Sequence, residues 1–417
     1  MSRRGFVGLV LLTAPAAVLA ACTASPSPAP TTSSPTGGGG TTGAPSAPGP
    51  RPEVVRSFGP NGTHWPAHTP WLGDENVAVT EVDCDWEAIS EAIAAVTPEQ
   101  AAAGVHIKIR PGTLPGGGSS SGSAGVLADI GSADWAQNVL VSPLEGRGSV
   151  TIDDEARLVG VHGVTFARLD GVVILMTNCT RSAWAHSKMT YGFRMAASYG
   201  ETTRECGAYE IVMADAKADI VDPFGYASGE GSLITDCVWE GCYGAPVFRP
   251  SGADDHVDSL QMYGTGSYRG LTLRDTAVFG SLNCALQLGG VADDDPYKGS
   301  SPFATLDHTL LTSQATAIQV RYPTPDGADT PKMAQAINGI GEPQHLYAND
   351  SLIFGSMHRS SWAVVSNCKV SSEGALENNA IQDGKWTYDA DMADWGAEEF
   401  DELAPIPTDE YLASVWT

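Results

Sequence analysis

The chain has 417 residues, with 49 Asp and Glu against 23 Lys and Arg and a formal net charge of -26. A surface this acidic repels phosphate backbones, so nucleic acid is not an expected partner. It also repels polyanionic glycans as a whole, unless a local basic cluster or a bound divalent cation reverses the sign.

Residues 1–21 have the features of an export signal. Arg3 and Arg4 precede the apolar run 9–21, which is a pattern of the twin-arginine type and is too short for the roughly 20 residues of a spanning helix. The sequence Leu19-Ala20-Ala21-Cys22 resembles the lipobox of bacterial lipoproteins, which implies that Cys22 is lipidated. We therefore expect an extracytoplasmic protein, anchored to the bacterial cell membrane at Cys22. The alternative is an ordinary secretory signal with a coincidental Cys.

The rest of the chain divides by composition. Residues 22–50 consist almost wholly of Ser, Thr, Pro, Gly and Ala, which predicts a disordered tether. Residues 51–104 are expected to form an N-terminal cap region, because apolar residues recur at helical spacing from Trp86 to Val96. Residues 105–383 carry short strands, and residues 384–417 are expected to pack over them as an acidic tail. One elongated domain and a monomer are expected.

One short pattern recurs in the strand region. An outward Gln lies between two inward apolar residues in Leu260-Gln261-Met262, Leu286-Gln287-Leu288 and Ile318-Gln319-Val320, and Arg194 has the same place in Phe193-Arg194-Met195. A second pattern brackets a polar bend residue with apolar ones. Asp236, Asp275, His308 and Asp350 occupy this bend, and their recurrence indicates a structural role.

A unit of three such strands cannot bury its own apolar face and must stack on its neighbours. The sequence therefore predicts an all-β fold, a right-handed single-stranded parallel β-helix with an N-terminal capping helix. The intervals between the Gln strands are 26 and then 32 residues, and the second is longer than the usual roughly 20 to 29 residues of a repeat, so loops must be inserted. Such loops gather on one side and would border a groove, with Gln261, Gln287 and Gln319 along its floor.

A family resemblance rests on His256, Asp258 and Gln261. The pattern His-x-Asp-x-x-Gln at the start of an outward strand resembles the pectate-lyase-like superfamily of parallel β-helix proteins, which implies a polysaccharide lyase, a glycoside hydrolase or a related glycan-active protein. In the pectin-hydrolysing branch the comparable place would make Asp258 the acid. The Asp pair and the Gly-His-Gly that this branch also needs are missing here, so inverting hydrolysis is not expected.

Two reactions fit these residues differently. Hydrolysis needs two carboxylates roughly 5 to 9.5 Å apart, for example Asp258 with Asp254 or Asp255. Elimination beside a uronate needs a base and a positive charge on the carboxylate. His256, Tyr263 or Tyr268 are candidate bases, and the candidate charges are Arg249, Arg269 or a calcium ion held by Asp254, Asp255 and Asp258.

We predict a cell-surface protein that cleaves a polysaccharide, with elimination slightly favoured over hydrolysis. The alternative is a non-catalytic module that binds a glycan or a partner at the cell envelope. The predicted catalytic residues are His256, Asp258 and Arg249. The predicted substrate-binding residues are Gln261, Gln287, Gln319, Arg194, Tyr263, Arg269, Arg321 and Tyr322.

Structural alternatives remain for three of these groups. The Gln residues would also serve as an amide ladder that keeps the coils in register. His256 and Asp258 would also satisfy backbone groups at a tight turn. Arg321 and Tyr322 would also pack a long loop.

Overall fold

The structure is a computed structural model that describes residues 58–117, 125–218, 224–253, 257–280, 283–289, 303–313, 315–330, 335–339, 345–375 and 379–417. The predicted export signal, Cys22 and the tether lie outside these residues and stay predictions. The predicted site residues Asp254, Asp255 and His256 also lie outside them.

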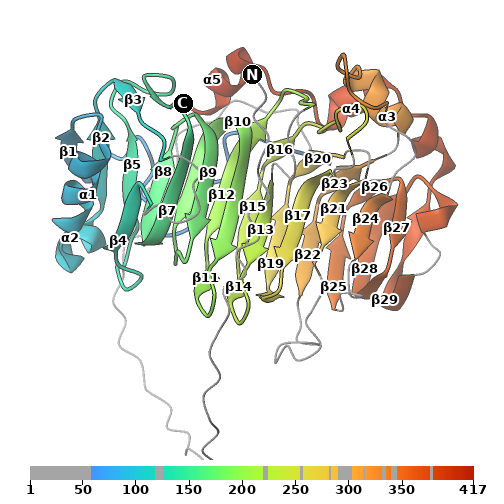
Figure 1. The fold of residues 1–417 in the computed structure, drawn as a ribbon, viewed down its shortest axis with the longest axis horizontal. Coiled ribbons are helices and arrows are strands. Elements are labelled where there is room, and N and C mark those ends of the chain that lie inside the picture. The colour runs from blue at the N-terminus through green and yellow to red at the C-terminus, as the bar shows by residue number, and fades with distance from the viewer. Residues whose placement is uncertain are drawn as a thin grey trace, which may run out of the picture. The chain divides into compact units, whose positions relative to one another are not determined.

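The described chain coils into a parallel β-helix (Figure 1). One coil contains β17 (Asp258–Gly264), β18 (Ser267–Arg269), β19 (Leu271–Arg274) and β20 (Ala277–Phe279), after which β21 (Cys284–Leu288) begins the next coil beside β17. The ladders between successive coils are parallel. The prediction of an all-β, parallel β-helix is thereby confirmed, although a coil has four strands and not the three that the sequence suggested.

The coils present three faces. Face 1 carries β4 (Leu127–Gly131), β7 (Glu155–His162), β9 (Gly171–Thr177), the second half of β10 (Ala183–Ala197), β13 (Phe224–Ser228), β17, β21, β24 (Gln335–Gly339) and β27 (Ser356–His358). Face 2 is short and carries β11 (Thr202–Arg204), β14 (Leu233–Thr235) and β18.

Face 3 is the longest and bends into two parts. The first part carries β1 (Ala78–Val82), β2 (Val105–Ile109), β5 (Val139–Pro143), β8 (Val164–Ala167), the first half of β10, β12 (Gly207–Met213), β15 (Val238–Glu240), β19, β22 (Ala304–Asp307), β25 (Leu346–Asn349), β28 (Ser360–Val370) and β29 (Asn379–Tyr388). The second part carries β16 (Tyr243–Gly244), β20, β23 (Leu310–Thr312) and β26 (Leu352–Phe354). A small separate pair, β3 (Gly112–Leu114) and β6 (Val150–Ile152), lies near the N-terminal end.

Two corners of the coil use residues in the left-handed region, where only Gly escapes a steric penalty. The corner within face 3, called the inner corner here, is formed in successive coils by His186, Glu210, Gly241, Asp275, His308 and Asp350. The corner between faces 2 and 3, called the outer corner, is formed by Arg181, Glu205, Asp236 and Gly270. The sequence analysis placed Asp236 at the same bend as Asp275, and this was wrong. Both corners follow a short apolar strand, so the local pattern does not tell them apart.

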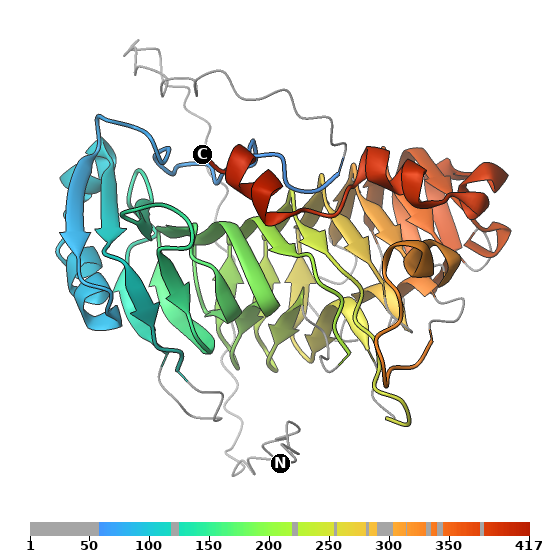
Figure 2. The same ribbon diagram turned by 90° about the horizontal axis from the view of Figure 1, so that it is seen from above.

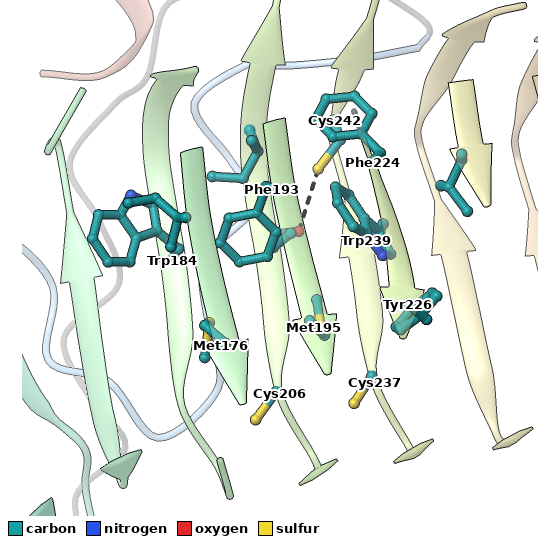
Figure 3. Packing of buried hydrophobic residues seen from close by; sticks show 14 of the residues in the cluster. Met176, Trp184, Phe193, Met195, Cys206, Phe224, Tyr226, Cys237, Trp239 and Cys242 are labelled. Atoms are coloured by element: carbon teal, nitrogen blue, oxygen red, sulfur yellow. Dashed lines mark hydrogen bonds between the residues drawn. The ribbon is translucent and has the colours of Figure 1, made fainter. Parts of the chain in front are cut away.

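The core runs along the inside of the coils and is filled by alternate strand residues. Its middle is aromatic: the ring of Trp239 lies 5.4 Å from that of Phe193 and 4.9 Å from that of Phe224 (Figure 3). Cysteines line the same interior, and the seven described cysteines are free. Cys206 and Cys237 lie in this core, so they act there as small apolar side chains.

Two helices lie at the N-terminal end of the coils (Figure 1). In α1 (Trp86–Ala94) the side chain of Asp85 accepts a hydrogen bond from the amide of Glu87, and Trp86, Ile89 and Ile93 are buried against the main core. The next helix, α2 (Pro98–Ala103), begins with a capping box at Thr97. Together they account for the helical spacing seen in the sequence.

The third predicted Gln strand is not a strand. Ile318 and Gln319 belong to α3 (Ala315–Arg321), and the strand that follows β21 in face 1 is β24, whose Asn338 lies opposite Gln287. An apolar-Gln-apolar triplet suits both a strand and a helix, whereas the four-residue spacing from Ile318 to Tyr322 is helical. That spacing was the missed signal.

Arg321 and Tyr322 lie in a second apolar core and not on an open surface. The hydroxyl of Tyr322 lies 2.6 Å from that of Tyr243, and the Arg321 guanidinium lies over the rings of Phe279 and Phe400 and 3.3 Å from a carboxylate oxygen of Asp401. The substrate-binding role predicted for these two residues therefore does not fit. The structural alternative, in which Arg321 and Tyr322 serve packing, fits these contacts.

The C-terminal segment forms η1 (Glu373–Ala375), β29, η2 (Ala390–Asp394), α4 (Ala397–Leu403) and α5 (Asp409–Val415). Met392, Phe400, Leu412 and Trp416 pack into the second core, against face 3. Residues 58–76, called the strap here, run along face 3 on the side that also carries α5 (Figure 2). None of the described helices has the length and apolar character of a membrane span.

Candidate functional site

Face 1 carries a column of polar side chains on successive coils. Register places Arg194 opposite Gly225, Gly225 opposite Gln261 and Gln261 opposite Gln287. The column, called the polar column here, continues from Gln287 to Asn338 and then to His358. These residues alternate with buried ones such as Leu260 and Met262, so their side chains project outward. Neighbouring members are about 5 Å apart along the axis.

The polar column is not equally open along its length. Gln287 is 2% exposed and Asn338 is 5% exposed, whereas Arg194, Gln261 and His358 are half-buried. Tyr263, two residues after Gln261 on the same strand, is 38% exposed and projects from the same face. The accessible groups of the polar column are therefore Arg194 and Gln261, with His358 towards the C-terminal end, and Tyr263 lies beside Gln261 on the same face.

The buried members are held by their neighbours. The amide nitrogen Nδ2 of Asn283 donates to Oε1 of Gln287 at 3.2 Å, and Nη2 of Arg359 donates to Oδ1 of Asn338 at 2.8 Å. These bonds hold the amides in fixed orientations. Gln287 is thus held by Asn283, four residues earlier in the chain, and is too buried to line an open groove.

From β9 onward, face 1 is nearly free of acidic groups, whereas β4 and β7 carry Asp129 and Glu155. Among the described residues of β9, β10, β13, β17, β21, β24 and β27, Asp258 is the one Asp or Glu, although the chain has 49. The side chain of Asp258 has the same parity as Leu260 and faces inward, where it is fully buried. The outward surface of these strands therefore presents amides, hydroxyls and the cation of Arg194 in an otherwise acidic protein.

The position of Asp258 does not suit the predicted catalytic acid. Its Oδ1 accepts hydrogen bonds from Nδ2 of Asn283 at 2.5 Å, from the amide of Cys284 at 3.1 Å and from Sγ of Cys284 at 2.7 Å. These contacts join two successive coils at the start of their strands. This is the structural alternative that the sequence analysis allowed for an Asp at a turn.

Arg249 is paired within the loops that follow face 3. Its Nε and Nη2 both donate to Oδ2 of Asp329, at 3.0 and 2.8 Å, beside an antiparallel bridge between Pro250 and Ala328. The guanidinium therefore joins the loop after β16 to the loop after α3. The structure gives Arg249 a bracing role and does not place it beside Asp258.

The remaining predicted residues are spread over other parts of the fold. Arg269 lies on β18 of face 2, opposite Thr235 and away from the polar column. Within the described ranges, no group of three or more His, Cys, Asp or Glu side chains is placed to hold a metal ion. The calcium site depends on Asp254 and Asp255 and stays a prediction.

A cluster of perturbed ionisable groups was missed by the sequence analysis. Glu210 at the inner corner is fully buried, and its carboxylate accepts from the amides of Asn61, Gly62, Thr63 and His64 in the strap at 2.9 to 3.2 Å. Nδ1 of His64 lies 2.7 Å from Oε1 of Glu210, and Nε1 of Trp416 donates to Oε2 of Glu210 at 2.6 Å. We call Glu210, His64, Asp275 and Trp416 the clasp.

The clasp continues along the inner corner. Nε2 of His64 lies 3.1 Å from Oδ2 of Asp275, and Nδ1 of His308 lies 2.6 Å from Oδ1 of Asp275. Burial alone would lower the pKa of His64, but hydrogen bonds to Asp275 and Glu210 raise that pKa to about 9. Burial would raise the pKa of Glu210, yet the bond from His64, the charges of His186 and His64, and the bond from Trp416 lower it to about 2.

Perturbed pKa values often mark functional sites, but structural ion pairs produce them as well. Here the strap and Trp416 supply the hydrogen bonds to Glu210, and both Glu210 and His64 are buried. A substrate would have to displace the strap to reach them. The clasp is therefore a structural device that fixes both ends of the described chain to face 3.

Neither a family model nor a curated protein matches the sequence. Among solved structures, the chain is similar to an alginate lyase from Paenibacillus sp. str. FPU-7, with 10% identity and a TM-score of 0.32 over 74% of this chain and 99% of that one. It is similar to the catalytic domain of a GH87 α-1,3-glucanase, with 11% identity and a TM-score of 0.29 over 77% of this chain and 67% of that one. A PL6 family polysaccharide lyase from Pseudopedobacter saltans has 9% identity and a TM-score of 0.24 over 80% of this chain and 96% of that one. Scores of this size do not establish a shared active site.

Proposed function

We propose that this β-helix protein binds an extended polysaccharide along face 1. The observation that carries the proposal is the polar column, in which Arg194, Gln261 and His358 project outward at fixed coil positions. The coil spacing of about 5 Å is comparable to the length of one pyranose unit. A glycan chain that runs along the axis of the coils therefore meets a repeating set of hydrogen-bonding groups.

The scarcity of acidic side chains on face 1 supports the proposal. An acidic protein would repel a uronate-containing chain, but the described strands of face 1 carry no outward carboxylate from β9 to β27. Arg194 adds a positive charge to this surface, and Tyr263 adds an exposed aromatic ring on which a sugar ring is able to stack. Face 1 thus suits both neutral and carboxylated glycans.

Cleavage by β-elimination is the second candidate function. Hydrolysis requires two carboxylates across the bond, whereas the one acidic residue of the described face 1 strands from β9 to β27 is inward and buried. Elimination requires a base and a cation: Arg194 and His358 project from the described part of face 1, and His256, outside the described residues, stays the predicted base. A bound calcium ion held by Asp254 and Asp255 is part of this candidate function.

We further propose that the protein is exported and anchored to the cell membrane through a lipid on Cys22. The supporting observations are Arg3 and Arg4, the short apolar run and the Leu-Ala-Ala-Cys sequence. Residues 22–50 would then act as a tether that holds the β-helix away from the membrane.

The test is a glycan-binding screen of the mature chain, with alginate, polygalacturonate and neutral glucans, each with and without calcium. Retention of the protein by at least one immobilised glycan supports binding. The appearance of the ultraviolet absorbance of unsaturated products adds elimination, and new reducing ends without that absorbance contradict it. Absence of binding to every glycan, in either buffer, contradicts the proposal.

A further inference from the structure

A hydroxyl and an imidazole lie side by side at the C-terminal end of face 1. Both belong to β27, in which Ser356 and His358 point outward on either side of the buried Met357. Oγ of Ser356 lies 3.2 Å from Nε2 of His358, which is within hydrogen-bond distance. We call Ser356 and His358 the terminal pair. A serine hydroxyl bonded to an imidazole is the arrangement that activates serine as a nucleophile.

The terminal pair is accessible from outside the coils. Ser356 and His358 are both half-buried, and the next residue, Arg359, is exposed. On the adjoining strand β24, Gln335 lies opposite Ser356 and Asn338 lies opposite His358. The two reactive side chains therefore have ordered neighbours on one side and still reach solvent.

A cation stands beside the terminal pair because of the backbone conformation of the next residue. Arg359 has φ of 54°, in the left-handed region where a residue with a Cβ is strained. The chain turns there from β27 into β28, and Nη2 of Arg359 donates to Oδ1 of Asn338 at 2.8 Å. This bond holds the guanidinium at face 1, next to the residue opposite His358. Backbone strain of this kind is concentrated at functional sites.

The guanidinium of Arg359 supplies donors for a developing negative charge. An arginine has five N–H donors, and the bond to Asn338 uses one of them. Neither β24 nor β27 contains Asp or Glu, so no carboxylate of these two strands neutralises the cation. A carbonyl oxygen that becomes an oxyanion beside Ser356 therefore meets a fixed positive charge.

We propose that the terminal pair is the catalytic centre of an esterase that removes short acyl groups from polysaccharide hydroxyls. Oγ of Ser356 attacks the carbonyl carbon of the ester, its proton passes to Nε2 of His358, and Arg359 stabilises the oxyanion. When the bond from this carbon to the sugar oxygen breaks, His358 gives the proton to the leaving hydroxyl. Water then attacks the acyl-serine and loses a proton to His358. The free acid leaves as Ser356 takes that proton back.

The surroundings of the terminal pair define the substrate class. Gln335, Asn338 and Arg359 border the pair, and such polar neighbours favour a short acyl group such as acetyl over a long aliphatic chain. His358 is also the last described member of the polar column, so a glycan bound along face 1 passes over the pair. The choice of a polysaccharide as the acyl carrier rests on the function proposed for face 1. The ester chemistry rests on Ser356, His358 and Arg359 alone.

The test measures the release of p-nitrophenol from p-nitrophenyl acetate and p-nitrophenyl palmitate by the mature chain. We expect the wild type to hydrolyse the acetate, and Ser356→Ala and His358→Gln to lose at least about a hundredfold in kcat/KM. Arg359→Met should lower kcat by about tenfold or more, with little change in KM. Ser366→Ala changes an exposed serine of β28, and this matched control should keep the wild-type activity.

A covalent probe separates loss of the chemistry from loss of the fold. A fluorophosphonate should form an adduct with the wild type, and peptide mass spectrometry should place this adduct on Ser356. Labelling should be at least about tenfold slower in His358→Gln, with an unchanged melting temperature, because the hydroxyl loses its base. An adduct on another serine, equal hydrolysis by the wild type and Ser356→Ala, faster hydrolysis of the palmitate, or no hydrolysis of either ester would each overturn the proposal.

Acetylated xylan and acetylated alginate test the acyl carrier. Release of acetate from either polymer by the wild type, and its loss in Ser356→Ala, supports the polysaccharide as the carrier. Hydrolysis of p-nitrophenyl acetate without acetate release from either polymer would overturn this carrier and count against face 1, while the ester chemistry of the terminal pair would stand.

Discussion

The imidazole of His64 occupies the space that a side chain at Gly241 would fill. A Cβ atom at Gly241 would lie 2.2 Å from Nδ1 of His64. Gly241 stands between Glu210 and Asp275 in the inner corner, so the strap inserts a cation where the coil itself leaves a gap. Two carboxylates on the coils either side of Gly241 thereby share one imidazolium.

The variant Gly241→Ala should release this contact. The added methyl group would displace His64, and φ of +65° adds strain for any residue with a Cβ. We expect the free energy of unfolding to fall by about 2 to 4 kcal/mol, because a buried pair loses its partner. Chemical denaturation followed by circular dichroism measures this change.

Gly252→Ala is the matched control for that experiment. Gly252 has φ of +80° and nothing within 4 Å of the position of an added Cβ, so it tests strain alone. We expect a loss of about 1 kcal/mol there. Equal losses at both positions would show that the contact with His64 does not stabilise the fold.

The clasp should make stability depend on pH in two directions. The pKa of His64 is raised from 6.5 to about 9, so its contribution is complete below pH 6.5 and is lost as the pH rises towards 9. The pKa of Glu210 is lowered from 4.5 to about 2, so its contribution is complete above pH 4.5 and is lost as the pH falls towards 2. The clasp therefore stabilises most between about pH 4.5 and 6.5.

The measurement compares His64→Gln with the wild type across this range. The wild type should be more stable by about 2 to 4 kcal/mol near pH 5.5, and the difference should shrink above pH 7. Burial lowers the pKa of His106 to about 4, so this residue titrates below the range compared, in both proteins. A difference that stays constant from pH 5.5 to 9 would contradict the charged state of His64.

The hydrogen bond from Trp416 to Glu210 should be measurable by a pair of Trp→Phe variants. Trp416→Phe keeps a ring against His186, whose ring stacks on Trp416 at 5.6 Å, but removes the donor to Glu210. We expect a loss of about 1 to 3 kcal/mol beyond the change in apolar contact.

Trp386→Phe supplies the reference for the change in apolar contact. Nε1 of Trp386 is buried without a partner, so this variant changes ring size and loses no hydrogen bond. If the two variants had the same melting temperature, the bond to Glu210 would contribute nothing to stability.

Two glutamines of the polar column should respond differently to substitution. Gln261 is half-buried on face 1, so Gln261→Ala should reduce polysaccharide affinity about fivefold to tenfold with little change in stability. Gln287 is buried and bonded to Asn283, so Gln287→Ala should destabilise the protein by about 1 to 2 kcal/mol. Affinity chromatography on the retained glycan and thermal unfolding separate the two effects. A glycan affinity that is unchanged in Gln261→Ala would argue against face 1.

Cys22→Ala tests the proposed anchor. In a bacterial host that processes lipoproteins, the wild-type chain should incorporate labelled palmitate and partition with the membrane, and Cys22→Ala should do neither. Cys84→Ala is a useful control because Cys84 lies in the folded domain. Palmitate labelling that persists in Cys22→Ala would exclude this residue as the attachment site.

The repeated strand pattern was predictable from the sequence, whereas the positions where that pattern is interrupted were not. Leu260, Met262, Leu286 and Leu288 alternate with Gln261 and Gln287, and that local period of two sufficed to predict the coils and the register of two members of the polar column. Asn338 was missed because the chain from β23 to β24 includes α3, and three residues do not distinguish a strand from a helix. Gln319 was misplaced for the same reason.

Contacts between distant segments could not be predicted. His64 and Glu210 are 146 residues apart, and the strap contains no repeat that would indicate which coils it crosses. Asp258 had the residue type and spacing of a catalytic acid, but its inward direction depends on where β17 begins. Arg249 found its partner in an inserted loop whose position only the fold defines.

The clasp also constrains the order in which segments of the chain dock during synthesis on the ribosome. The strap leaves the ribosome early, yet its partners Glu210 and Asp275 are synthesised much later, and Trp416, which donates to Glu210, follows later still. The early coils are able to stack on one another as they emerge, because each contacts only its neighbours. The strap must therefore remain undocked until Glu210 and Asp275 have been synthesised, and Trp416 joins the clasp after both.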